Sequence, residues 1–332
     1  MLCLTLLIVL FESVVVWGQL QLGNDIDGEA AIDLSGQSVS LDGNRLAIGA
    51  FLNDASGNDA GHARIYEWDG TTWTQLGADI DGEATFDFSG ISVSLDGNLV
   101  AIGGVDNDGN GSNAGHVRVY EWDGANWVQL GADIDGEAAE DRSGWSVVLD
   151  STRLAISAYK NDGNGNNAGH VRVYEWNGSS WVQLGADIDG EAPNDAFGQA
   201  VALEGNRLAV CASFNDDAGR NAGHTRVYEW DGANWVQLGA DIDGEAAGDS
   251  GKSVVLDGNR VAAGAPLNDG NGNNAGRVRV HEWNGSNWTQ LGADIDGEAS
   301  NDLMGLTMAL AGNTLVVGAP YNDGNGSNAG QV

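Results

Sequence analysis

The sequence repeats itself along almost its whole length. The motif Asp-Ile-Asp-Gly-Glu occurs six times, with successive copies separated by 54 residues four times and by 53 residues once; its first residues are Asp25, Asp79, Asp133, Asp187, Asp241 and Asp294. A fixed period of this size is typical of arrays of supersecondary units, none of which buries a core alone. We therefore expect residues 19–332 to form a single domain.

Each repeat contains four segments with the pattern of short strands. In the third copy these are Gly144–Leu149, Arg153–Ala158, His170–Trp176 and Trp181–Leu184, rich in β-branched and aromatic residues. The first turn is Asp-Gly or Gly-Asn in sister copies, which is typical of a tight hairpin. Residues 161–169, rich in Asn and Gly, predict a loop.

Four short antiparallel strands in each of six units, with no helical periodicity, predict an all-β β-propeller. The number of blades should be about six, or seven if the sequence is a fragment of a longer chain. A β-helix is the alternative, but its rungs are much shorter than 54 residues.

The composition is strongly acidic. The sequence has 48 acidic and 14 basic residues, and a formal net charge of -34. Such a chain repels nucleic acid and anionic membranes, because phosphate binding needs clustered Lys and Arg. Such a surface would suit cations, a basic partner or a saline environment.

The first 18 residues resemble a secretory signal peptide. Leu2 to Leu10 are continuously apolar, and small residues precede a cleavage point before Gln19. We expect a secreted or cell-surface protein, with no membrane insertion after the signal is removed.

Two short motifs carry a family resemblance: the dipeptide Phe-Gly and the tripeptide Gly-Ala-Pro. Phe197-Gly198 opens a strand segment, and Gly264-Ala265-Pro266 and Gly318-Ala319-Pro320 close others. The array resembles FG-GAP repeats, the blade unit of the N-terminal propeller of integrin α-subunits. The resemblance implies cell adhesion or another extracellular binding function. Most copies have Ser in place of the Phe, as in Ser143-Gly144.

Calcium-binding members of that family carry an acidic loop between the FG and GAP strands. Here the connection is only Leu-Asp-Gly-Asn, which is too short to supply several oxygen ligands. The family's calcium loop therefore cannot be assigned to any repeat.

The acidic residues instead concentrate between one unit and the next. Their spacing resembles that of an EF-hand loop, without its Gly at position 6 or its Glu at position 12. We expect either weak Ca²⁺ sites or solvated, capped loops at three such segments: Asp79, Asp81, Glu83 and Asp87; Asp133, Asp135, Glu137 and Asp141; Asp187, Asp189, Glu191 and Asp195.

Three other residue types recur or stand out. Trp pairs such as Trp176 and Trp181 flank each outer turn, and we expect them to brace hairpins or pack between units rather than bind sugars. A histidine opens the third strand of four units (His62, His116, His170 and His224). These positions should be far apart around a ring, which favours a structural role. Cys211 should be a small buried residue.

No set of nucleophile, base and orienting group can be assembled, so we expect no enzyme activity. We expect a non-enzymatic extracellular binding protein. One alternative is a fragment of a larger calcium-binding surface adhesin, and a less favoured one is a propeller lyase or glycosidase. We expect a protein or glycan ligand at the face formed by the acidic loops.

The sixth copy stops two residues into its third strand, at Val332. Residues 19–23 match the end of a repeat and could supply a fourth strand to the last unit. We expect five sound units and a defective sixth near residues 306–332, with an open edge that could associate with a partner.

Overall fold

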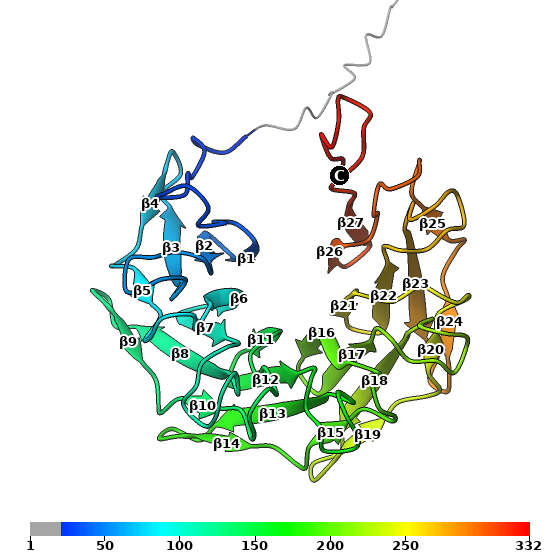
Figure 1. Cartoon of the computed structure of the whole chain (residues 1–332), viewed down its shortest axis with the longest axis horizontal. Coiled ribbons are helices and arrows are strands. Elements are labelled where there is room, and N and C mark those ends of the chain that lie inside the picture. The colour runs from blue at the N-terminus through cyan, green and yellow to red at the C-terminus, as the bar shows by residue number, and fades with distance from the viewer. Residues whose placement is uncertain (1–20) are drawn as a thin grey trace, which may run out of the picture.

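The computed structural model describes residues 21–332, whose strands form an open arc of sheets (Figure 1). Five sheets contain the four predicted strands and a sixth contains two. These described residues contain no helix. The predicted all-β architecture of repeated antiparallel sheets is confirmed, but the ring is not closed. The expected signal peptide, residues 1–18, lies outside the described part.

Each sheet begins with an inner strand and continues outward through a second strand and, in the five complete sheets, a third (Figure 1). The inner strands are β1 (Ser38–Asp42), β6 (Ser89–Asp96), β11 (Val147–Asp150), β16 (Phe197–Glu204), β21 (Ser253–Asp257) and β26 (Thr307–Ala311). The second strands are β2 (Arg45–Ala50), β7 (Leu99–Gly104), β12 (Arg153–Ala158), β17 (Arg207–Ala212), β22 (Arg260–Ala265) and β27 (Thr314–Gly318). The third strands are β3 (His62–Trp68), β8 (His116–Trp122), β13 (His170–Trp176), β18 (His224–Trp230) and β23 (Arg277–Trp283).

The outer position of each of the five complete sheets is shared by two short strands. The first set is β4 (Trp73–Gln75), β9 (Trp127–Gln129), β14 (Trp181–Gln183), β19 (Trp235–Gln237) and β24 (Trp288–Gln290). The second set is β5 (Ile80–Asp81), β10 (Ile134–Asp135), β15 (Ile188–Asp189), β20 (Ile242–Asp243) and β25 (Ile295–Asp296). β4 pairs with the end of β3, whereas β5 pairs with its first two residues, so that His62 lies opposite Asp81.

The core lies between neighbouring sheets rather than within one. Ala47 and Ile65 of the first sheet belong to one buried cluster with Val93 and Ile102 of the second, and Trp127 packs against it. Equivalent clusters join the following sheets. Each repeat therefore buries its apolar face only against a neighbour, as the period predicts.

A tryptophan at the start of each fourth strand also ties neighbouring sheets together. Trp127 donates a hydrogen bond from Nε1 to the carbonyl oxygen of Leu76, 2.8 Å away, at the end of the preceding repeat. The ring also packs against Trp122, with centroids 5.4 Å apart. Four further pairs repeat the hydrogen bond: Trp73–Leu22, Trp181–Leu130, Trp235–Leu184 and Trp288–Leu238. These contacts agree with the expected packing of the tryptophans between units.

The two ends of the arc do not meet (Figure 1). Within residues 21–332, no strand pairing connects the N-terminal segment to β26 or β27. The carbonyl oxygen of Leu22 accepts the hydrogen bond from Trp73 of the first sheet instead. The expected completion of the sixth sheet by residues 19–23 is therefore not seen; residues 19 and 20 lie outside the described part.

The segment that connects two sheets meets the loop after the second strand. We call residues 133–141 and their equivalents the link. Asn110, in the loop after β7, donates from Nδ2 to the carbonyl oxygen of Gly136 in the link, 2.8 Å away. The links and these loops therefore occupy one end of every sheet, which we call the link end. The opposite end carries the β1–β2 and β3–β4 turns, and we call it the hairpin end.

Candidate functional site

The four acidic residues of one link point to different partners. Asp133 lies with its Oδ2 3.9 Å from Nδ1 of His116 on the preceding sheet. Glu137 lies with its Oε2 3.7 Å from Nδ1 of His170 on the following sheet. Asp135, between them, is exposed on β10.

The fourth acidic residue of the link, Asp141, is buried and caps a turn. Its Oδ2 accepts hydrogen bonds from the backbone N–H of Ala138 and from Nδ2 of Asn161, both at 3.0 Å. Asp87 and Asp195 are bonded in the same way to Asn107 and Asn215. The residues predicted as Ca²⁺ ligands are thus divided between neighbouring sheets, and their role in binding Ca²⁺ stays a prediction.

What the structure brings together is one histidine and two carboxylates from successive links. There are four such groups, which we call the Glu–His–Asp clusters: Glu29, His62 and Asp79; Glu83, His116 and Asp133; Glu137, His170 and Asp187; Glu191, His224 and Asp241. In each, one potential ligand atom from every residue lies within 4.8 Å of the other two.

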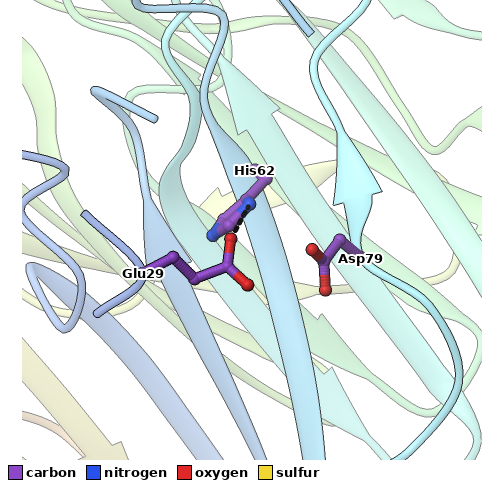
Figure 2. Close-up of side chains that lie close together, drawn as sticks. All are labelled: Glu29, His62 and Asp79. Carbon is purple, nitrogen blue, oxygen red and sulfur yellow. Dashed lines mark ion pairs between the residues drawn. The ribbon is translucent and has the colours of Figure 1, made fainter. Parts of the chain in front are cut away.

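The first cluster shows the arrangement (Figure 2). His62 opens β3, and its imidazole lies between Glu29 of the preceding link and Asp79 of the following one. Its side chain is 1% exposed, and its Nδ1 is 3.9 Å from Oε2 of Glu29. That buried Nδ1 has no hydrogen-bond partner among the described residues.

An arginine two residues after each histidine completes the electrostatic surroundings. In the second cluster, Arg118 donates from one terminal nitrogen to the carbonyl oxygen of Asp81 at 2.7 Å, and the other lies 3.5 Å from Glu83. Arg64 and Arg172 make the same two contacts in the first and third clusters. Each of these three clusters therefore contains two carboxylates but one guanidinium, which pairs with the glutamate alone, and an excess negative charge remains when the imidazole is neutral.

Burial keeps the imidazoles of His116 and His170 neutral at pH 7. It lowers the pKa of His116 and of His170 to about 4, with the neighbouring Arg118 and Arg172 acting in the same direction. The carboxylates of Asp133 and Asp187 oppose this shift but are weaker than the burial. Burial also lowers the pKa of His224. A neutral imidazole keeps a lone pair that can bind a metal ion.

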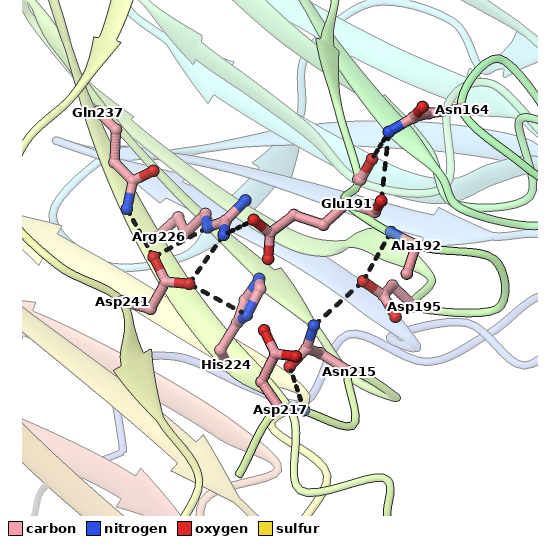
Figure 3. A network of polar contacts seen from close by, with 11 residues as sticks. Asn164, Glu191, Ala192, Asp195, Asn215, Asp217, His224, Arg226, Gln237 and Asp241 are labelled. Atoms are coloured by element: carbon pink, nitrogen blue, oxygen red, sulfur yellow. Dashed lines mark hydrogen bonds and ion pairs between the residues drawn. The ribbon is translucent and has the colours of Figure 1, made fainter.

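The fourth cluster differs in the position of its arginine (Figure 3). Arg226 turns toward the carboxylates: it donates to both oxygens of Asp241, at 2.9 and 2.8 Å, and pairs with Glu191. His224 remains beside them, with Nδ1 3.7 Å from Asp241. Here the guanidinium occupies the space between the two carboxylates.

The fifth sheet replaces the histidine with an arginine. Arg277 opens β23, at the position that His224 holds in β18. Its guanidinium pairs with Glu245 and Asp294, the equivalents of the two cluster carboxylates, and with Asp296 at 2.6 Å. The same pair of carboxylates thus holds a permanent positive charge.

The histidine clusters were not predicted from the sequence. The four histidines do lie in four different sheets, as expected, but each meets a Glu and an Asp whose positions differ by about one repeat, as with Glu83 and Asp133. A signal was present in the sequence, because the histidine recurs in step with both carboxylates and changes to arginine at position 277.

Cys211 is fully buried, as predicted, and its Sγ lies 3.3 Å from Oγ1 of Thr225. Burial raises the pKa of this thiol to about 12, so the reactive thiolate is scarce at neutral pH. Cys211 is therefore a packing residue.

Comparison with protein families identifies the repeat. The family model of the FG-GAP repeat matches residues 26–66, 133–174, 187–228 and 293–332. This chain is an FG-GAP repeat protein. FG-GAP repeats occur in extracellular or secreted proteins. A search of curated proteins gives no match.

This FG-GAP protein lacks room for the family's calcium loop in the hairpins that the structure describes. β1 and β2 are separated by Gly43 and Asn44 alone, and Asp42 pairs directly with Arg45. Among residues 21–332, no helix is both long and apolar enough to cross a membrane.

Proposed function

We propose that this FG-GAP protein is a non-enzymatic extracellular binding protein that uses its link end to hold a basic segment of a protein ligand, as in adhesion. One observation carries the proposal. An exposed aspartate occupies the same place at the link end of all five complete sheets: Asp81, Asp135, Asp189, Asp243 and Asp296.

The surroundings of these aspartates favour a basic ligand. Each of them lies on the short second outer strand, next to the start of the third strand, so the five carboxylates repeat with the spacing of the sheets. Opposite charges across an interface speed association and select the partner. A ligand with several Lys or Arg side chains would meet several equivalent carboxylates, and multivalency strengthens weak single contacts.

A glycan ligand has less support at this end. The exposed aromatic residues that the structure describes at the link end, Phe86, Phe214 and Tyr321, belong to three separate repeats and form no recurring aromatic surface. The paired tryptophans lie at the hairpin end, where they are half-buried against each other and against the neighbouring sheet. Charge complementarity therefore favours a protein partner.

The proposal is tested by measuring binding of the full chain to immobilised peptides of equal length that are lysine-rich, neutral or acidic, together with an oligosaccharide array. We expect binding to the basic peptides alone, weakening as NaCl rises because exposed charges are screened. Equal binding to neutral peptides, or binding to glycans only, would contradict it.

A further inference from the structure

The buried histidines of the Glu–His–Asp clusters have an unmet hydrogen-bonding capacity. Nδ1 of His62 and Nδ1 of His170 are each without a partner among the described residues, although both side chains are only 1% exposed. Buried polar atoms nearly always have a hydrogen-bond partner, and an exception is explained, for example, by a bound ion. Here the exception recurs at equivalent positions in different sheets, and the unpaired nitrogen faces two carboxylates.

The donor atoms and their spacing suit a first-row divalent metal ion. Nδ1 of His116 is 3.9 Å from Oε2 of Glu83 and 3.9 Å from Oδ2 of Asp133. Zn²⁺ bonds to nitrogen and oxygen are about 2.0–2.2 Å long, which places neighbouring ligands of a tetrahedral site about 3.4 Å apart. Each histidine–carboxylate distance would have to contract by roughly half an ångström. The two carboxylates, which lie within 4.8 Å of each other, can approach further because both side chains are partly exposed.

The imidazole nitrogen also discriminates between metals. Ca²⁺ and Mg²⁺ prefer oxygen ligands only, whereas imidazole suits Zn²⁺ and its neighbours in the first transition row. One nitrogen and two carboxylate oxygens fill three positions of a tetrahedral zinc site, and water or a fourth ligand would fill the last.

In the fourth and fifth sheets, an arginine pairs with both of the equivalent carboxylates and offsets their negative charge. In the fifth, the guanidinium of Arg277 replaces the histidine and pairs with both Glu245 and Asp294. In the fourth, Arg226 pairs with both Glu191 and Asp241. In the first three clusters, the arginine bonds a link carbonyl and pairs only with the glutamate, so no guanidinium within residues 21–332 pairs with the aspartate.

We propose that the first three Glu–His–Asp clusters each bind one divalent transition-metal ion, with Zn²⁺ as the representative, and that these ions join neighbouring repeats at the link end. Each ion would be held by a glutamate of one link, an aspartate of the next link and the histidine between them. It would neutralise the carboxylates as Arg277 does in the fifth sheet. This proposal is independent of the proposed binding of a basic ligand.

The test is to count the ions that the full chain binds. After treatment with EDTA and dialysis against Zn²⁺, calorimetry and native mass spectrometry should find three ions per chain that the variant H62Q/H116Q/H170Q lacks. The glutamine change removes the imidazole without altering the charge. His281, buried in the fifth sheet outside the clusters, supplies the control: H281Q should retain all three ions.

A second variant distinguishes loss of a metal site from misfolding of the triple variant. H116R copies the residue found at position 277, so its fold should be preserved by circular dichroism while one ion is lost. Zn²⁺ should also raise the melting temperature of the unchanged chain but not of H62Q/H116Q/H170Q, because an ion that binds only the folded state stabilises it.

Three results would overturn the proposal: no Zn²⁺ bound by the unchanged chain, the same count in the unchanged chain and H62Q/H116Q/H170Q, or three ions retained by H116R. Ca²⁺ in place of Zn²⁺ should give no binding that depends on these histidines, and histidine-dependent Ca²⁺ binding would contradict the choice of metal.

Discussion

Asn161 donates a hydrogen bond from its Nδ2 to Oδ2 of Asp141, 3.0 Å away, and both side chains are buried. The contact fastens the loop after the second strand to the link that enters the same sheet. It recurs in five of the six repeats: Asp33–Asn53, Asp87–Asn107, Asp141–Asn161, Asp195–Asn215 and Asp302–Asn322. The last acidic residue of each of these links is therefore a structural group.

Replacing Asp141 with Ala should destabilise the protein. The change leaves the buried amide of Asn161 and the N–H of Ala138 without their acceptor, at a cost of about 1–3 kcal/mol. Urea unfolding followed by tryptophan fluorescence measures the loss. Asp135→Ala, an exposed position in the same link, is the matched control and should change stability little. Equal effects of the two substitutions would contradict the assignment.

The hydrogen bond from Trp181 to the preceding sheet should also contribute to stability. Trp181→Phe keeps an aromatic ring but removes the Nε1 donor that bonds Leu130, so we expect a loss of about 1 kcal/mol or more. Trp176→Phe tests ring size alone, because Nε1 of Trp176 bonds no acceptor among residues 21–332. The contact would be unimportant if both variants melted at the same temperature.

Stability should fall as the solution is acidified from pH 7.5 to 5.5. The pKa of His116 and of His170 is about 4 in the folded protein and near 6.5 in the unfolded chain. As the pH falls below 6.5, these two histidines therefore take up protons in the unfolded chain but not in the folded protein. The free energy of unfolding is highest above pH 6.5 and decreases below it. Around His116, Arg118 lowers the pKa further, whereas Asp133 and Asp87 oppose that.

The measurement is the urea midpoint at several pH values in EDTA, which excludes effects of bound metal. The window stays above pH 5.5 because burial raises the pKa of carboxyl groups such as Asp135, whose contribution has the opposite sign. The double substitution H116Q/H170Q should flatten the dependence. An unchanged slope in that variant would show that other groups titrate.

The sixth sheet should be the least protected against hydrogen exchange. β26 and β27 form a two-stranded sheet, and Val316 at its centre is 46% exposed. An isolated hairpin is marginally stable in water. Amides of β27 should exchange much faster than those of β17, whose residues are almost all buried. Equal protection of the two strands would contradict this expectation.

The sequence was sufficient to predict the regular part of the fold. In the third repeat, Arg153–Ala158 and His170–Trp176 have the predicted bounds, because tight turns and β-branched residues mark them locally. The inner strand begins later than predicted, at Val147. Gly144 has a φ of 90°, and its equivalents Gly90 and Gly198 lie at register shifts near the start of β6 and β16, so pairing is irregular at this position.

The missed features depend on contacts between distant segments. The two-residue strand Ile188–Asp189 carries no periodicity, and it forms only because the chain returns to the start of β13. Glu137 and Asp187 lie about one repeat apart, and only the stacking of sheets brings both to His170. Reading the acidic residues within a single link could not reveal this pairing.

The claim that the link end holds the ligand is tested most directly by comparing two sets of charge removals. D81N/D135N/D189N removes three exposed carboxylates at the link end. D69N/D123N/D231N removes three at the hairpin end, where Asn177 and Asn284 occupy the equivalent positions in other repeats. Each set changes the net charge equally, and EDTA in the buffer excludes bound metal.

The measurement is the dissociation constant of each variant for a lysine-rich peptide by biolayer interferometry at fixed salt. We predict binding about tenfold weaker for D81N/D135N/D189N, since each exposed ion pair contributes up to about 1 kcal/mol, and almost unchanged for D69N/D123N/D231N. Equal weakening by both sets would contradict binding at the link end.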